Sequence, residues 1–146
     1  MVALLRLLFS LEQDFTFCPG QHQTGLEMML NNNRAILLVA EKNSTIIGMC
    51  TGQLMISTAE GGLSLLVEDV VVDNSRQGNG VGTALLGALQ DWGTKKNVVR
   101  LQLLADRSNS PALNFYHKLQ WHQTQLICLS KRPTTSEHAN TENTEN

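Results

Sequence analysis

A glycine-rich segment between a predicted strand and a predicted helix is the part of this sequence that points most directly to chemistry. It reads Gln77-Gly78-Asn79-Gly80-Val81-Gly82-Thr83, with glycine at every second position. Glycine tolerates positive φ angles and lets the backbone approach a ligand closely. Unpaired amides at a helix N-terminus, at the positive end of the helix dipole, suit a pyrophosphate. The segment therefore predicts an anion-binding loop, although alternate glycines can also serve only a tight strand-to-helix turn.

This loop does not match the two common nucleotide-binding patterns. A Walker loop needs Lys followed by Ser or Thr after its last glycine, and Thr83-Ala84 follows Gly82 here. The dinucleotide pattern GxGxxG has a different spacing and needs an acidic residue about 20 positions further on. A nucleotide-binding module is therefore not expected.

Two acids lie inside the strongest strand signal of the chain. The run Leu63–Val72 reads LSLLVEDVVV, which is typical of a central strand covered on both faces. Acids in such an environment are usually functional or paired with a cation. By simple alternation Glu68 shares a face with Val70 and Val72, so it is the first candidate for a catalytic carboxylate.

Hydrophobic periodicity predicts one α+β domain over residues 1–130, followed by a disordered polar tail over residues 131–146. Cys18-Pro19-Gly20 is expected to end the first helix. The strand–helix–strand order between residues 63 and 104 predicts a right-handed parallel crossover within a mixed sheet. The expected helices cover about residues 3–14, 24–30, 80–95 and 109–119, and the expected strands cover 34–41, 45–55, 63–72, 98–104 and 123–130.

Composition excludes several other classes of protein. The 146 residues are 42% apolar and 16% charged, with a formal net charge of −2, so nothing suggests a nucleic-acid partner. Three widely spaced cysteines form no CxxC pair and have no histidines at metal-ligand spacing, so we expect free thiols and no metal. The apolar start contains Arg6 and reads as a helix rather than a signal peptide. No run is long enough to span a membrane, and a cytoplasmic location is expected.

The glycine loop and a second motif resemble the signatures of the GNAT superfamily of N-acetyltransferases. The first is similar to the family pattern Q/R-x-x-G-x-G/A. Asn109-Ser110-Pro111-Ala112 followed by Phe115-Tyr116-His117-Lys118 is similar to the second, N-x-x-A…F-Y-x-K-x-G-F. The resemblance covers about residues 30–130 well. The chain departs from the family by starting almost inside the first helix, by having Gln77 where arginine is common, and by having Gln120 where the second pattern has glycine.

The resemblance implies acetyl-CoA as cosubstrate and no metal. The coenzyme would enter where strands 63–72 and 98–104 separate, with strand main chain on its pantetheine and loop amides on its pyrophosphate. The residues implied in coenzyme binding are Val70, Val71 and Val72 in the strand, Gln77, Gly78, Asn79, Gly80, Val81, Gly82 and Thr83 in the loop, and Asn109, Ala112, Phe115 and Tyr116 in the last helix.

Attack of an amine on a thioester requires a neutral amine, whereas free alkylamines have a pKa near ~10, so a base or a water chain is needed. Glu68 is the expected base, and a β-bulge, frequent in this strand of the family, would instead present Asp69. Tyr116 would act as general acid for the departing thiolate, unless it is only a core tyrosine.

The function predicted in this way is an acetyl-CoA-dependent N-acetyltransferase that acetylates a primary amine of a small molecule or peptide by direct attack on the thioester. The segment Val67–Val72 resembles that of amino-sugar-phosphate acetyltransferases, but a small amine, an amino acid and a protein amine all stay open as acceptors. The alternative is a CoA-binding regulatory module without catalysis. The resemblance also allows a homodimer.

Overall fold

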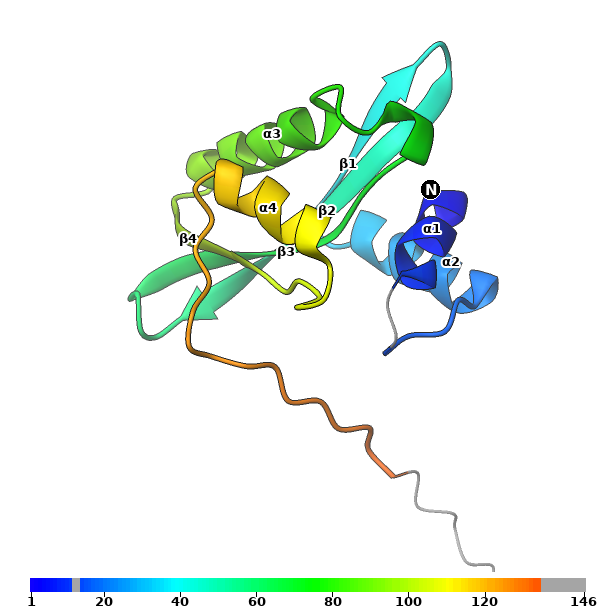
Figure 1. Cartoon of the computed structure of the whole chain (residues 1–146). Coiled ribbons are helices and arrows are strands. Elements are labelled where there is room, and N and C mark those ends of the chain that lie inside the picture. Colours follow the sequence, from blue (N-terminus) through cyan, green and yellow to red (C-terminus); the bar gives the residue numbers. More distant parts are fainter. Residues whose placement is uncertain (12–13, 135–146) are drawn as a thin grey trace, which may run out of the picture.

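A four-stranded sheet lies between two groups of helices (Figure 1). The computed structural model describes residues 1–11 and 14–134. The elements in chain order are the helices α1 (Val2–Ser10) and α2 (Pro19–Leu30), the strands β1 (Ala35–Lys42), β2 (Thr45–Ser57) and β3 (Gly62–Val72), the short 3-10 helix η1 (Asn74–Arg76), the helix α3 (Val81–Lys95), the strand β4 (Val98–Leu103) and the helix α4 (Ser110–Lys118).

The sheet has the simple order β1-β2-β3-β4. The β1–β2 and β2–β3 pairs are antiparallel, whereas β3 and β4 are parallel and joined through α3. The predicted α+β class, the mixed sheet and the parallel crossover between residues 63 and 104 are therefore confirmed.

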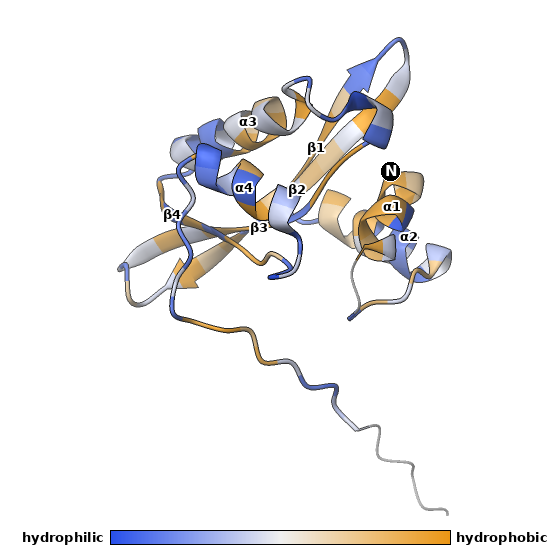
Figure 2. Cartoon of the chain, viewed as in Figure 1, coloured by the Kyte–Doolittle hydropathy of each residue, from blue (hydrophilic) through white to orange (hydrophobic). Residues whose placement is uncertain are grey.

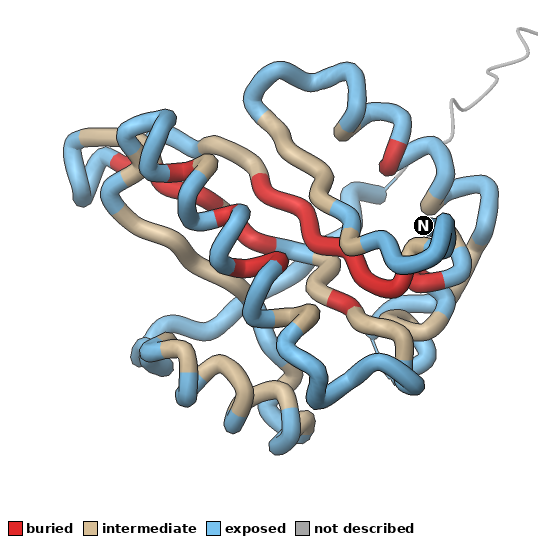
Figure 3. Tube along the Cα trace, turned by 90° about the horizontal axis from the view of Figure 1, so that it is seen from above, coloured by how far each residue is buried: buried red, intermediate tan, exposed pale blue. Residues whose placement is uncertain are grey.

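Each face of the sheet carries its own hydrophobic cluster, and the buried positions follow the central strands and the inner side of α3 (Figure 3). On one face α3 contributes Leu85, Leu86 and Leu89 to a core with strand side chains, and α4 packs partly against the same core. On the other face Leu4, Leu5 and Leu26 from α1 and α2 cover Met49 and Val71. Helical periodicity in the sequence predicts that the inner stripe of α3 consists of Val81, Ala84, Leu85, Ala88, Leu89 and Trp92. This stripe is wrong in part, because Ala84 and Ala88 are exposed and Leu86 is buried.

A β-bulge interrupts β3 at the two acids. Val67 packs in the cluster under α3, called the α3-side cluster, whereas Val71 packs in the cluster under α1 and α2 on the other face. Regular alternation would put both of these odd-numbered residues on one face. The register against β2 slips by one residue in this stretch, and Asp69 has a φ of 52°. The bulge therefore turns Glu68 and Asp69 to the α1/α2 face together.

This bulge overturns the alternation argument made from the sequence. Val70 and Val72 pack against the α3-side cluster. Glu68 instead pairs in register with Thr51, whose hydroxyl lies on the α1/α2 face because it binds Asp69 there. The expectation that Glu68 shares a face with Val70 and Val72 is wrong. The extra residue of the bulge places each side chain after it on the face opposite to the one that regular alternation predicts.

The N-terminal helices differ from prediction at their ends. The second helix begins at Pro19 rather than at residue 24, because proline fits the first turn of a helix, where its missing N–H costs no hydrogen bond. The first helix ends at Ser10 rather than near residue 14. No strand precedes α1 among the described residues. Within residues 1–11 and 14–134, no helix is long and apolar enough to cross a membrane.

The last predicted strand, residues 123–130, is wrong. Residues 122–134 form neither helix nor strand, and the sheet ends at β4. A run with strand propensity becomes a strand only when it has a partner, and this segment has none within the described chain. Residues 135–146, most of the predicted disordered tail, lie outside the described residues.

Candidate functional site

The two parallel strands of the sheet separate halfway along β3. Their pairing ends at Val67 with Leu103, whereas β3 continues to Val72. Along Glu68–Val72, the main-chain groups that point away from β2 have no strand partner among the described residues. A ligand that contains amides can pair with such an edge as an added strand does. The stretch predicted to bind pantetheine, Val70 to Val72, therefore has the open backbone that this role requires.

The glycine loop ends in an uncapped helix terminus. Gly78 and Gly80 have φ angles of 78° and 80°, and Gly80 is the N-cap of α3 without any side-chain cap. The amide of Ala84 makes the first bond of the helix, 3.0 Å from the carbonyl oxygen of Gly80. The amides of residues 81–83 therefore have no acceptor within the helix and stand at its positive end. This arrangement fits the pyrophosphate of a coenzyme.

Side chains of the loop hold the loop itself. Nε2 of Gln77 donates to the carbonyl oxygen of Val72 at 3.2 Å and to Oδ1 of Asn74 at 3.1 Å. Nδ2 of Asn79 donates to the carbonyl oxygen of Arg76 at 3.3 Å. These bonds tie the loop to the end of β3 and to η1. The loop conformation is thus set by its own amide side chains, which leaves the backbone amides to face a ligand.

The second motif positions α4 against α3. Oδ1 of Asn109 accepts a hydrogen bond from the amide of Ala112 at 3.2 Å and so caps α4. Unlike its two neighbouring glycines, Gly82 does not have a positive φ, but a Cβ there would lie 3.0 Å from Cζ of Phe115. The glycine at position 82 therefore lets the ring of Phe115 approach the first turn of α3.

Tyr116 lies on α4 and packs partly into the α3-side core near Cys50. Its ring meets Trp121 edge-on with centroids 6.1 Å apart. Burial, and then the neighbouring Cys50, raises the pKa of Tyr116 to about 12. The phenol therefore keeps its proton at neutral pH and remains a hydrogen-bond donor.

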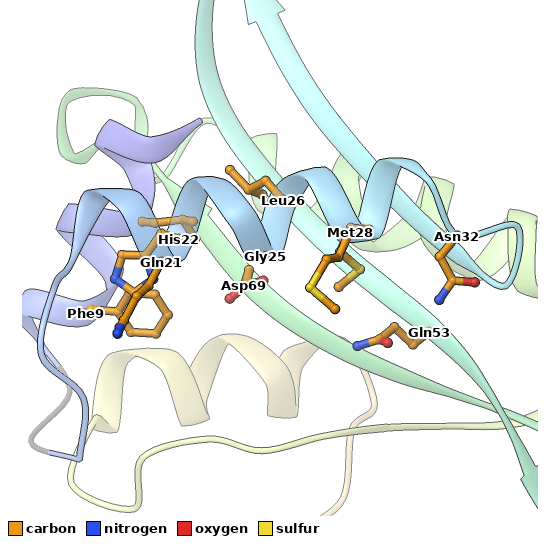
Figure 4. Close-up of a pocket in the computed structure, with 11 residues that line it drawn as sticks. Phe9, Gln21, His22, Gly25, Leu26, Met28, Asn32, Gln53 and Asp69 are labelled. Carbon is orange, nitrogen blue, oxygen red and sulfur yellow. The ribbon is translucent and has the colours of Figure 1, made fainter.

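A cavity of about 350 Å³ lies between α2 and the opposite face of the sheet (Figure 4). Asp69 from β3 and Gln53 from β2 form its strand side, beneath α2. Its helix side consists of α1 and α2 residues and one residue from the turn after α2: Leu5, Phe9, Gln21, His22, Gly25, Leu26, Met28, Met29 and Asn32. Of these residues, sequence reasoning had singled out only Asp69, because the others come from separate elements without a common spacing.

Asp69 is the acid that faces this cavity. Its Oδ2 accepts a hydrogen bond from Oγ1 of Thr51 at 3.0 Å. Burial raises the pKa of Asp69, while the Thr51 hydroxyl and the nearby His22 act in the opposite direction. The adjacent Glu68 is an exposed residue outside the cavity lining, and its pKa is raised by partial desolvation of its carboxyl and by the charge of Asp69.

Cys50 connects the two sides of the site. Burial, and then the charge of Asp69, raises the pKa of the Cys50 thiol to about 12, and the same thiol acts on the pKa of Tyr116. Sγ of Cys50 contacts the carbonyl oxygen of Leu85 at 3.8 Å on α3. Cys50 is next to Thr51, which binds Asp69, and Tyr116 packs against the core cluster that contains Cys50.

His22 forms part of the cavity wall and is packed between aromatic rings. Its ring stacks on Phe9 at 4.7 Å and lies 5.0 Å from the ring of Phe17. Nε2 accepts a hydrogen bond from the amide of Cys18 at 3.0 Å. The amide of Cys18 therefore helps to hold the orientation of the ring, with Nε2 as the acceptor.

The sequence of residues 5–121 matches the family model described as the Acetyltransferase (GNAT) family. The chain belongs to the GNAT acetyltransferase family. This match spans the α1/α2 face, the glycine loop and α4, so the resemblance seen in the two motifs is confirmed over most of the fold, and the chain is an N-acetyltransferase. No curated protein matches the chain.

Solved structures agree with this fold. An aminoglycoside acetyltransferase from an uncultured soil metagenomic sample is 22% identical, with a TM-score of 0.76 over 91% of this chain and 86% of that one. AAC(6')-Iy in complex with a CoA-S-monomethyl-acetylneamine bisubstrate analogue is 18% identical, with a TM-score of 0.75 over 91% and 89%. Glucosamine-6-phosphate N-acetyltransferase from Arabidopsis thaliana is 19% identical, with a TM-score of 0.70 over 90% and 88%.

The contact between Gly82 and Phe115 can be tested by substitution. Gly82→Val should displace the Phe115 ring and disturb the first turn of α3, so that acetyl-CoA raises the melting temperature much less than it does for the unchanged protein. Gly87→Val on the same helix is the control, because a Cβ at Gly87 meets nothing within 4 Å. Differential scanning fluorimetry over a range of acetyl-CoA concentrations provides the measurement. An undiminished shift for Gly82→Val would show that this packing is not needed for binding.

Proposed function

We propose that this enzyme transfers the acetyl group of acetyl-CoA to a primary amine of a small molecule by direct attack on the thioester. The observation that carries the proposal is the position of the β3 bulge. At the stretch where β3 leaves β4, the bulge turns Asp69 into the cavity under α2. An amine in that cavity and a coenzyme beside the open edge of β3 would meet there.

The residues of this chain suit acetyl-CoA as cosubstrate. The open backbone of Val70–Val72 would pair with pantetheine amides, and the amides of Val81–Thr83 would hold the pyrophosphate. Gln77 and Asn79 would keep the loop in shape, and Asn109 would keep α4 in place. Bound acetyl-CoA supplies an acetyl group activated as a thioester.

Asp69 is the residue that we propose as the base. It lies in the cavity wall, whereas Glu68, the first choice from the sequence, does not. Its raised pKa makes its carboxylate a stronger base than an ordinary aspartate, while Thr51 holds one oxygen in place. The carboxylate would take a proton from the bound amine, directly or through one water. Glu68 remains the alternative that experiment must exclude.

Tyr116 would supply the second proton. Its phenol stays protonated at neutral pH and approaches the core from α4, on the side of β3 opposite the cavity. A neutral phenol there can donate its proton to the sulfur that leaves when the C–S bond breaks. The two proposed proton-transfer groups would thus act from opposite faces of the sheet.

The chemistry of the cavity wall favours an acceptor without an anionic group. The lining residues include Asp69, His22 and the amides of Gln21, Asn32 and Gln53, but no lysine or arginine. A phosphate or carboxylate is usually met by Lys or Arg. A cationic amine that also carries hydroxyl groups fits this wall better, which agrees with the aminoglycoside acetyltransferases among the structural neighbours.

A thiol-release assay with a panel of amines tests the proposal. Hydroxylated amines such as aminoglycosides and glucosamine should have kcat/KM values at least ~10-fold above those of glucosamine 6-phosphate and free amino acids, because an unpaired anion near Asp69 is unfavourable. A preference for the phosphorylated sugar would contradict the proposed acceptor class. Binding of acetyl-CoA without thiol release for any amine, peptides included, would instead support a non-catalytic CoA-binding module.

The role of Asp69 predicts a distinctive pH profile. Because its pKa is raised, the carboxylate forms only above the ordinary aspartate range, so kcat/KM should fall as the pH is lowered through that raised value. Asp69→Asn should remove this acid limb and lower kcat/KM by about 10²-fold or more. Glu68→Gln is the matched control, with the same change at the neighbouring residue, and should keep most of the activity and the limb.

Thr51→Val gives an independent test of the same group. It removes the hydrogen bond that stabilises the Asp69 carboxylate, so the acid limb should move to higher pH. If Glu68→Gln loses the limb and Asp69→Asn keeps it, Glu68 is the base and this assignment is wrong.

Tyr116→Phe separates an acid role from a packing role. The substitution keeps the ring against Trp121 and removes only the hydroxyl. An acid role predicts a loss in kcat of about 10²-fold or more with little change in acetyl-CoA affinity. Thiol-release kinetics and the melting temperature, measured on the same variant, distinguish the acid role from the packing role. Full turnover by Tyr116→Phe on a good acceptor would remove Tyr116 from the mechanism.

A further inference from the structure

A row of exposed residues lies along the open side of the cavity, on α2 and the turn after it. Its members follow the helical spacing i, i+4, i+7 and i+11, so they share one side of the helix, and each of them lines the cavity. The row consists of Gln21, Gly25, Met28 and Asn32. Gly25 is the only member without a side chain, and it therefore leaves a gap between Gln21 and Met28.

Neither the backbone nor the packing of the described residues requires a glycine at position 25. Gly25 lies inside α2 and does not have a positive φ. A Cβ there would meet nothing within 4 Å. Inside a helix, glycine is less favourable than any residue except proline. Little packing offsets this cost, because Leu26 is the buried residue of α2 and the first turns of the helix are hydrophilic (Figure 2).

The gap lies over the proposed base. Gly25 and Asp69 line the same cavity, and Figure 4 shows Asp69 on its strand below the turn of α2 that contains Gly25. The cavity volume of about 350 Å³ is near the lower end of the range of roughly 300–1,000 Å³ that is typical of small-molecule sites. In a cavity of this size, a side chain at position 25 would take space that a ligand beside Asp69 needs.

Two amide side chains form one end of the cavity. Gln53 on β2 and Asn32 lie at the end away from Phe9 and His22 (Figure 4). Oδ1 of Asn32 accepts a hydrogen bond from the amide of Arg34 at 2.9 Å, so its Nδ2 is the group that can donate to a ligand. An amide side chain can both donate to and accept from a hydroxyl group. This end of the cavity therefore suits the hydroxyl groups of an acceptor.

We propose that Gly25 is a specificity-determining residue of the acceptor site, a role that rests on the function proposed above. Its missing side chain admits an amine attached to a ring between α2 and Asp69, with the hydroxyl groups of the ring toward Gln53 and Asn32. A larger residue at position 25 would leave room only for a slender, unbranched amine. Gly25 takes no part in proton transfer, but it decides which amines reach the carboxylate of Asp69.

Substitutions at position 25, assayed with amines of different size, test this role. For glucosamine and the two-ring aminoglycoside neamine, Gly25→Leu should raise KM at least ~10-fold with little change in kcat, and Gly25→Ala should have a smaller effect. For propylamine, which has neither ring nor hydroxyl, kcat/KM should stay close to that of the unchanged protein. Because alanine and leucine are better helix formers than glycine, the melting temperature should not fall.

Two further variants make the test specific. Gly20→Leu is the matched control, because Gly20 lies on the same helix with nothing within 4 Å of an added Cβ, but does not line the cavity. It should leave KM unchanged for all three amines. Gln53→Met keeps the length of the side chain and removes its amide. It should raise KM for neamine and glucosamine but not for propylamine, because only the first two carry hydroxyl groups.

Binding measurements distinguish a failure of this role from a failure of the proposed transfer reaction. Isothermal titration calorimetry of the full chain with neamine gives a dissociation constant without turnover. Neamine binding without thiol release would contradict the transfer reaction, whereas weaker binding by Gly25→Leu would still support the role of Gly25. Equal neamine affinity and KM for Gly25→Leu and the unchanged protein would overturn that role. An equal loss for propylamine and neamine would also overturn it, and so would an unchanged protein that binds neither neamine nor glucosamine.

Discussion

The one-residue bulge in β3 decides how the rest of the site is arranged. Before the bulge Val67 packs toward α3, and after it Val71 packs toward α1 and α2. The extra residue lets the sheet bury both faces while two adjacent acids point the same way. Asp69 adopts a positive φ of 52° to achieve this, a strained conformation that the bond from Thr51 helps to hold. Without the bulge, Asp69 would point into the α3-side core rather than the cavity.

Two helix ends complete the site by different means. The start of α3 has no side-chain cap and therefore presents free amides, whereas the start of α4 is capped by Asn109. The first is available to a ligand, and the second is closed so that the position of α4 is fixed. Gly82 links the two, because its missing side chain admits Phe115. The family's two sequence motifs thus correspond to an uncapped helix start, which we propose as the binding feature, and to a packing feature.

Local patterns in the sequence by themselves determined several helices, strands and loops of this protein. The glycine loop and the helix that follows it depend on residues close together in the chain, so their spacing predicted them. The strand over residues 63–72 and its parallel crossover to β4 were also predicted from the sequence, because a short continuous apolar run is typical of a strand buried on both faces. The family match over residues 5–121 agrees with what these patterns indicated.

Tertiary structure alone decided three other features. Whether Glu68 or Asp69 faces the cavity depends on a register slip against β2, which no pattern within β3 reveals. The cavity wall unites Gln53, His22 and Asn32 from separate elements, so their meeting depends on how α2 packs over the sheet. The run at 123–130 has the composition of a strand but lacks a partner in its own sheet. Strand propensity is local, whereas the hydrogen bonds that make a strand are supplied by a neighbour.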